Sequence, residues 1–167
     1  GGGRGPGRRP VPLDINYAGF FAVGVKLMAD HLQAVLTDLS TRAVAELTLT
    51  VPSRRDPHEV AGQVGRAVQA LIAGSGAPPR QVIGVGIGLS GVVDARRGVS
   101  VLSPRLGWQD VPFARLVTER AGVPAWIDND SNAFAAAQML FGHGRNVENF
   151  LVVIVGQGVG AGLVLGG

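Results

Sequence analysis

The chain of 167 residues contains no cysteine, a single lysine (Lys26) and only 5% aromatic residues. Without cysteine, these residues can form no disulfide, no thiolate nucleophile and no sulfur-ligated zinc site. The longest unbroken apolar run, Phe150 to Val155, is far too short to span a bilayer. No signal-peptide pattern is visible either, because no apolar stretch precedes Phe20. We therefore expect a cytoplasmic protein with no membrane partner.

Charge is also scarce, at 16% of residues, and the net charge of +3 arises from Arg4, Arg8 and Arg9 near the amino terminus. The remaining 12 basic residues (15 minus these three) balance the 12 acidic ones. A neutral body is a poor electrostatic footprint for nucleic acid, so we expect this chain alone to bind DNA only weakly. Residues 1–15, rich in Gly, Arg and Pro, predict a flexible linker that joins the body to a preceding segment.

The body of the chain begins with strand-like segments and continues as alternating helices and strands. Short connections between the first strands predict antiparallel pairing. The first helix has the strongest local signals, an N-cap acid at Asp56, a proline at Pro57 and a capping-box Glu59. The predicted strands are 20–27, 31–38, 43–51, 82–89, 124–127, 150–155 and 160–165, and the predicted helices begin at residue 57, at about 111 (ending at 121) and at about 131 (ending at 141). Residues 90–110 are predicted to be largely irregular, with β-like runs on both sides of an Arg96–Gly98 turn.

This order of elements predicts an α/β fold, a mixed sheet with three antiparallel strands and then alternating helices and strands. The last hairpin resembles the beginning of a second unit that repeats the opening hairpin. We therefore expect a first lobe over residues 16–145 and the first hairpin of a truncated second lobe over residues 146–167. Alone, that hairpin would expose apolar residues and unpaired edges, which favours self-association.

A cluster of acids and amides, Asp128 to Asn132, separates the strand at 124–127 from an alanine-rich helix. One interpretation is a helix N-cap, in which Asn129, Asp130 or Ser131 accepts from the first free amides of the helix. The other is a ligand site, because a carboxylate and its neighbouring amides stand together at the end of a strand.

Two glycine-rich segments are ambiguous. Gly86 to Gly91 satisfies the G-x-G-x-x-G pattern, but a β-like run follows where a dinucleotide-binding fold needs a helix, so the glycines better serve close approach of a ligand to the backbone. Gly156 to Gly162 could present amides to a phosphate or merely form a hairpin turn. The three histidines are scattered, and no metal site is predicted from them.

Four of these stretches, in this order, resemble the ROK family of repressors, open reading frames and kinases. They are Val23–Val25, Gly86–Asp94, Ser103–Trp108 and Ile127–Gly142, and the closing run Gly156–Gly167 is similar to the second phosphate loop of the family. The resemblance implies an actin-like ATPase fold of two ribonuclease-H-like lobes, with sugar and nucleotide bound between them. The chain would then supply the amino-terminal lobe.

The resemblance also implies roles for individual residues. Asn129 and Asp130 match the pair that holds sugar hydroxyls, and Ser90 and Gly91 match the backbone that approaches the sugar from the other side. In kinase members of the family, Asp130 would also be the general base on the hydroxyl that attacks the γ-phosphate.

The departures from the kinase pattern affect the nucleotide loops. Lys26 stands where kinases carry an acid, Arg105 replaces an asparagine, Gln138 a glutamate and Gln157 a threonine. Phosphoryl transfer depends on precise electrostatic positioning of Mg²⁺ and phosphates. We therefore expect a degenerate nucleotide loop, formed by Lys26 with the three glycines of the closing turn, Gly156, Gly158 and Gly160.

The sequence thus predicts the sugar-sensing effector domain of a ROK transcriptional regulator, without enzymatic activity and without a cofactor in this chain. DNA would be bound only through a helix-turn-helix domain outside this chain. The resemblance also implies a zinc site in the second lobe and a homo-oligomeric parent protein. Two alternatives remain open: an ATP-dependent sugar kinase that uses MgATP, and an interaction module with an inactive cleft.

Overall fold

The computed structural model describes residues 14–51, 56–156 and 158–167. The predicted linker lies outside the described residues except for Asp14 and Ile15. The strands are β1 Phe21–Leu27, β2 His31–Asp38, β3 Ala43–Thr50, β4 Val82–Leu89, β5 Val92–Asp94, β6 Val99–Ser103, β7 Trp108–Val111, β8 Ala125–Asn129, β9 Asn149–Val155 and β10 Val159–Leu165. The helices are α1 Pro57–Ser75, α2 Phe113–Ala121 and α3 Asp130–Phe141, with short 3-10 turns at Tyr17–Gly19 and Pro79–Gln81.

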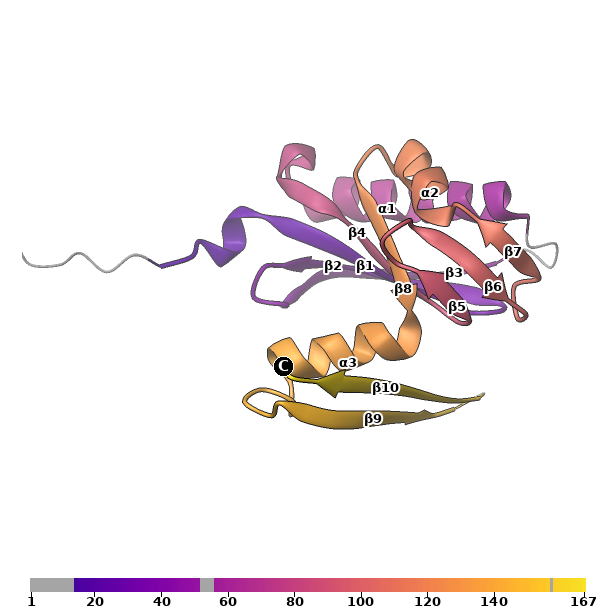
Figure 1. Cartoon of the computed structure of the whole chain (residues 1–167). Coiled ribbons are helices and arrows are strands. Elements are labelled where there is room, and N and C mark those ends of the chain that lie inside the picture. Colours follow the sequence, from indigo (N-terminus) through magenta and orange to yellow (C-terminus); the bar gives the residue numbers. More distant parts are fainter. Residues whose placement is uncertain (1–13, 52–55, 157) are drawn as a thin grey trace, which may run out of the picture.

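A five-stranded sheet in the order β3-β2-β1-β4-β8 forms the larger part of the molecule (Figure 1). The first three strands are antiparallel, whereas β4 and β8 run parallel to β1. This arrangement confirms the predicted mixed α/β fold.

Helices α1 and α2 cover one face of this sheet, and the hydrophobic core lies beneath them (Figure 1). An apolar stripe on α1 is buried along its whole length, from Val60 to Ile72. The Asp56 carboxylate accepts from the backbone N–H of His58, and Gly76 ends the helix in the left-handed region at a φ of 73°. In the described part of the chain, no helix has both the length and the apolar character to cross a membrane.

The stretch predicted to be irregular contains a second, three-stranded antiparallel sheet in the order β5-β6-β7. Its strands have three to five residues and pair only with each other, so their alternation is too short to be recognised in sequence. Helix α2 accordingly begins later than predicted, because Val111 belongs to β7 and Pro112 is the N-cap. Strand β8 is longer than predicted and continues to Asn129.

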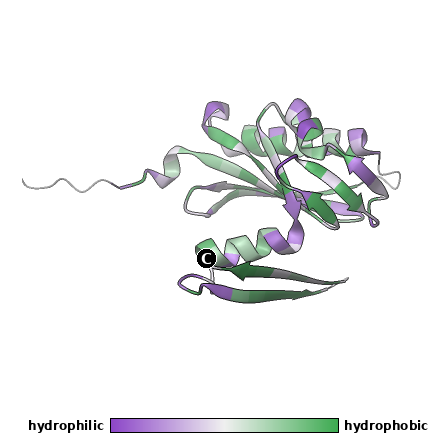
Figure 2. Cartoon of the chain, viewed as in Figure 1, coloured by the Kyte–Doolittle hydropathy of each residue, from purple (hydrophilic) through white to green (hydrophobic). Residues whose placement is uncertain are grey.

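The last part of the chain is a layer formed by α3 and the β9–β10 hairpin (Figure 1). Helix α3 packs mainly on the hairpin and less on the main sheet. A Cβ at Gly162 would lie 2.5 Å from the Ser131 carbonyl oxygen and 2.7 Å from the Ala135 Cβ. The outer surface of the hairpin is apolar and exposed, as predicted (Figure 2). Its consequence, self-association, stays a prediction.

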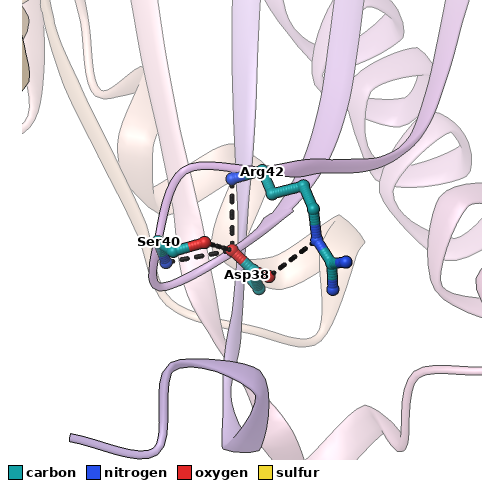
Figure 3. A network of polar contacts seen from close by, with 3 residues as sticks. All are labelled: Asp38, Ser40 and Arg42. Carbon is teal, nitrogen blue, oxygen red and sulfur yellow. Dashed lines mark hydrogen bonds and ion pairs between the residues drawn. The ribbon is translucent and has the colours of Figure 1, made fainter.

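The turn between β2 and β3 is organised by Asp38 (Figure 3). Its Oδ1 accepts from the Ser40 hydroxyl at 2.6 Å and from the backbone N–H groups of Ser40 and Arg42, while Oδ2 accepts from the Arg42 guanidinium at 3.2 Å. The hydrogen bond from the Ser40 side chain is the main cause that lowers the pKa of Asp38, although desolvation acts in the opposite direction.

Candidate functional site

The sheet face opposite α1 and α2 forms one wall of a groove of about 1530 Å³, and α3 and β9 form the other wall. The strand register places the wall residues of the sheet in two rows that cross all five strands. One row is Thr48, Gln33, Lys26, Gly88 and Asp128, and the next is Glu46, Val35, Gly24, Gly86 and Trp126. Polar side chains from strands far apart in the sequence therefore meet on one surface.

Glycines form the floor of this groove. Gly24, Gly86 and Gly88 lie on neighbouring strands, and a Cβ at Gly86 would meet no described heavy atom within 4 Å. A Cβ at Gly88 would lie 3.5 Å from the Asp130 Cα. The floor at Gly86 is therefore open backbone, whereas the start of α3 lies over Gly88. That β4 admits close approach of a ligand stays a prediction.

The cluster at the start of α3 contains the predicted N-cap, while its role as a ligand site stays a prediction. Asn129 is the N-cap, because its Oδ1 accepts from the N–H groups of Ser131 at 2.9 Å and Asn132 at 3.3 Å. Its Nδ2 donates to the Gly91 carbonyl oxygen at 2.9 Å. Asn129 thereby fixes the Gly91 backbone to the start of α3, although it does not itself line the groove.

Asp130 is the first residue of α3, and it lines the groove. A helix N-terminus favours an ionised carboxylate, which accepts hydrogen bonds only. The Ser131 hydroxyl donates to Asp130 Oδ1 at 3.5 Å, and no other hydrogen bond to this carboxylate is found among the described residues. Asp130 is well suited to receive hydroxyl groups of a ligand.

The predicted Ser90–Gly91 segment lies beside Asn129, but neither residue lines the groove. Gly91 has a φ of 112°, and a Cβ there would overlap the Leu102 carbonyl oxygen. Close packing against β6 therefore requires this glycine, whatever ligand binds. Of the four residues predicted to contact sugar, the structure brings all into one region and places only Asp130 in the groove wall.

The predicted nucleotide-loop residues are separated. Lys26 lines the groove, whereas Gly156 and Gly158, in the β9–β10 turn, and Gly160, on β10, do not. A Cβ at Gly158 would lie 3.0 Å from Nη2 of Arg105, and one at Gly160 would overlap the Ser131 hydroxyl. Packing against neighbouring residues thus accounts for these two glycines. The predicted substitution at Gln157 lies outside the described residues.

Sequence reasoning missed the two rows across the sheet and the proximity of Arg105 to the closing turn. Trp126 and Phe134, which also line the groove, carried no functional signal in the sequence. Both features were missed because strand register and contacts between loops depend on residues that are distant in the sequence. The only signal at Arg105 was that it replaces an asparagine expected from the family pattern.

The described residues contain no group of three or more His, Asp or Glu side chains that could hold a metal ion. At the end of β1, the position where a magnesium-bound nucleotide would need an acid carries Lys26, whose positive charge opposes a cation. The residues present therefore do not fit MgATP at this strand end, and no reaction step is derived through it.

Comparisons with known proteins agree on one protein family. The ROK family profile matches residues 22–167. A putative xylose repressor of Caldicellulosiruptor sp. (strain Rt8B.4) is 35% identical over 162 residues, which are 96% of this chain and 40% of the repressor. The chain therefore spans about 40% of the length of this curated relative.

Two solved structures agree with this result. A ROK family transcriptional regulator, a homologue of the E. coli MLC protein, matches with a TM-score of 0.80 at 23% identity, over 90% of this chain and 38% of the regulator. At that identity the match shows the fold alone. A ROK hexokinase from Thermus thermophilus matches with a TM-score of 0.74 at 30% identity, over 88% of this chain and 47% of the enzyme. Both structures support an actin-like ATPase fold.

Proposed function

Because the chain belongs to the ROK family, we propose that it forms the sugar-sensing part of a transcriptional regulator. Residues 16–145 would be the amino-terminal lobe, and residues 146–167 the first hairpin of the second lobe. A putative xylose repressor that is 35% identical over 96% of this chain supports this assignment.

The observation that carries the proposal is the composition of the groove. Asp130 offers a hydroxyl acceptor, and Asn129 holds the neighbouring Gly91 backbone in place. Lys26 occupies the same groove, where phosphoryl transfer would require an acid to position Mg²⁺. Recognition of a sugar needs the first two features only, whereas a kinase needs the missing acid as well.

In the full-length protein, the sugar would lie between the two lobes and favour one lobe arrangement. A ligand shifts such an equilibrium only as far as its affinity differs between the two states. DNA would be bound by a helix-turn-helix domain outside this chain, and the regulator would act as a homo-oligomer. Any zinc would be held by the second lobe, where the family resemblance implies its site.

The second candidate is an ATP-dependent sugar kinase with Asp130 as general base. The 30% identity to a ROK hexokinase favours it, and the position of Asp130 at the start of α3 is compatible with it. Lys26 opposes it, for the electrostatic reason given above.

A thermal-shift screen of the full-length protein tests both candidates. Hexoses, pentoses and N-acetylated sugars are each added with and without MgATP, and a ligand at 100 times its dissociation constant stabilises by roughly 2.7 kcal/mol. We expect a shift with a sugar and no further shift with MgATP. We also expect Asp130→Asn to weaken sugar binding, while the melting temperature without ligand stays nearly constant.

Two results would overturn the proposal. A shift that grows with MgATP, together with phosphorylation of the sugar, would establish the kinase. Absence of a shift with every sugar would favour an interaction module with an inactive cleft.

A further inference from the structure

We propose that the groove selects a monosaccharide that carries an anionic group, either a phosphate or a carboxylate. Lys26 would hold the anion, and Asp128 and Asp130 would receive the hydroxyl groups. This inference rests on the proposed function, because it names the class of sugar that the same site binds.

The first support is the position of Lys26. It is the only lysine of a chain that otherwise uses arginine for its basic residues. Its side chain is exposed at the groove wall, near the end of β1. Among the residues that the structure describes, no carboxylate lies within ion-pair distance of its ammonium group. Lys26 is therefore available to an anion that enters the groove.

The second support is the spacing along one row of the sheet. Lys26 is in register with Gly88 on β4, and Gly88 with Asp128 on β8. Lys26 and Asp128 are thus two strand spacings apart, about 10 Å. Gly88 between them contributes no side chain, but the start of α3 lies over it, with the Asp130 Cα 3.5 Å from the place of a Cβ. The open part of the floor is Gly86 in the neighbouring row, where a Cβ would meet no described heavy atom within 4 Å. A sugar ring over Gly86 would direct one charged substituent to Lys26 and its hydroxyl groups to the carboxylates.

The third support is the separation of charge within the groove. Asp128 lies on β8 and Asp130 begins α3, and Glu46 lies on β3, in the neighbouring row. Ionised carboxylates accept hydrogen bonds and so pair with hydroxyl groups. An anionic group placed beside them would be repelled, whereas the lysine ammonium is a compact donor suited to phosphate. The charges therefore favour one orientation of the ligand, with its anion at Lys26.

Trp126 completes the arrangement. It belongs to the neighbouring row, beside Gly86, and its side chain is exposed at the groove. An exposed indole offers a flat apolar surface on which the carbon face of a sugar ring can pack. A Cβ at Gly84 would overlap the Trp126 ring, so the indole extends toward Gly84 and away from the row of Lys26 and Asp128. A sugar ring packed on it would lie over Gly86, with Lys26 and Asp128 at its other edge.

Isothermal titration calorimetry of the full-length protein tests this inference. Each neutral sugar is compared with its charged relatives: glucose with glucose 6-phosphate and glucuronate, and N-acetylglucosamine with its 6-phosphate. Inorganic phosphate is titrated as the bare anion. We expect a charged member of a pair to bind between about 10 and 100 times more tightly than the neutral one. Whether the phosphates or glucuronate show the preference identifies the anion.

Substitutions assign the preference to one residue. Lys26→Met keeps an unbranched chain without its charge and is expected to abolish the preference, whereas Lys26→Arg keeps most of it. Arg66→Met removes the same charge from α1, on the covered face of the sheet, and is expected to leave the preference unchanged.

Three results would overturn the inference. Equal binding of neutral and charged sugars, or a preference that survives Lys26→Met, refutes it while the proposed sugar sensor stands. Inorganic phosphate that binds as tightly as a sugar phosphate also refutes it, because the sugar would then contribute nothing. If no sugar binds, neutral or charged, the proposed function fails as well.

Discussion

The opening hairpin, β1–β2, and the closing hairpin, β9–β10, have similar local patterns and opposite burial. Both are antiparallel pairs rich in Val and Leu. In the opening hairpin, Leu32 and Leu36 are 0% exposed, whereas in the closing hairpin Val155 and Val159 are 79% exposed. Hydropathy alone does not distinguish them (Figure 2).

The difference comes from what lies on each hairpin. Helix α1 packs on β2 and β3, and β4 extends the sheet beyond β1. The closing hairpin is a two-stranded sheet that contacts α3 on one face, and within the described residues nothing covers its other face. Alternation of apolar residues thus indicates strand pairing, while burial depends on elements that are distant in the sequence.

The largest effect is expected from a matched pair of leucine substitutions. Leu36→Ala, in the covered hairpin, should lower the free energy of unfolding by about 2–5 kcal/mol, because it leaves a cavity in the core. Leu163→Ala, in the exposed hairpin, should change it by about 0.5 kcal/mol or less. Chemical denaturation of both variants measures the contrast, and equal losses would refute the difference in burial.

A smaller effect is expected at a close contact between the closing hairpin and α3. Gly162→Ala would push a methyl group into the Ser131 carbonyl and Ala135, and overpacking of this kind costs about 1–3 kcal/mol. Gly156→Ala is the control, since its Cβ would meet no described atom within 4 Å. Hydrogen exchange should become faster in β10 for the first variant only. Unchanged protection would mean that α3 does not hold the hairpin as described.

The next smaller loss of stability is expected at Asn129, at the junction between the main sheet and the layer of α3 and the β9–β10 hairpin. Asn129→Ala removes the N-cap of α3 and the bond to Gly91, and loss of such a cap costs about 1–2 kcal/mol. Asn129→Asp keeps the cap acceptor and loses the donor, so it should restore the cap part of the loss. Denaturation of both variants separates the two contributions, and equal destabilisation by Ala and Asp would show that the cap contributes little.

The smallest effect is expected at the β2–β3 turn and depends on pH. The pKa of Asp38 is lowered by its hydrogen bonds, so the ionised form stabilises the fold. This contribution is present above the ordinary pKa of 3.8 and is lost as the pH falls through the lower pKa of the folded state. Asp38→Asn should therefore be less stable than the wild type at neutral pH, with a difference that shrinks in acid.

Ser40→Ala provides the matching control for Asp38. It removes the hydrogen bond that lowers the pKa most and should raise the Asp38 pKa toward its ordinary value. Nuclear magnetic resonance titration of the carboxyl group measures the change. An unchanged pKa would contradict the role assigned to the Ser40 hydroxyl.

Elements with strong local signals were predicted well. The bounds of β2, His31–Asp38, were as predicted, and α1 begins after its Asp56 cap and ends before Gly76. The β5–β7 sheet was missed, since three short strands that pair with each other resemble irregular structure. The predicted boundary between lobes, after residue 145, stays a prediction.

The candidate site was predictable in part. The change from strand to helix at Asn129 and Asp130 identified both residues, and the resemblance to the ROK kinases identified the departure at Lys26. Their sugar contacts stay predictions. The placement of Lys26 opposite Asp128 across Gly88 could not be foreseen, because it depends on the register of three strands that are separated by helices.

The sequence by itself determined the order of helices and strands, the capped ends of α1 and the polar start of α3, because backbone preferences and caps act between neighbouring residues. Only the tertiary structure decided which faces are covered and which side chains share the groove. Burial and register arise from contacts between distant segments, so the same alternation of Val and Leu becomes core in one hairpin and surface in the other.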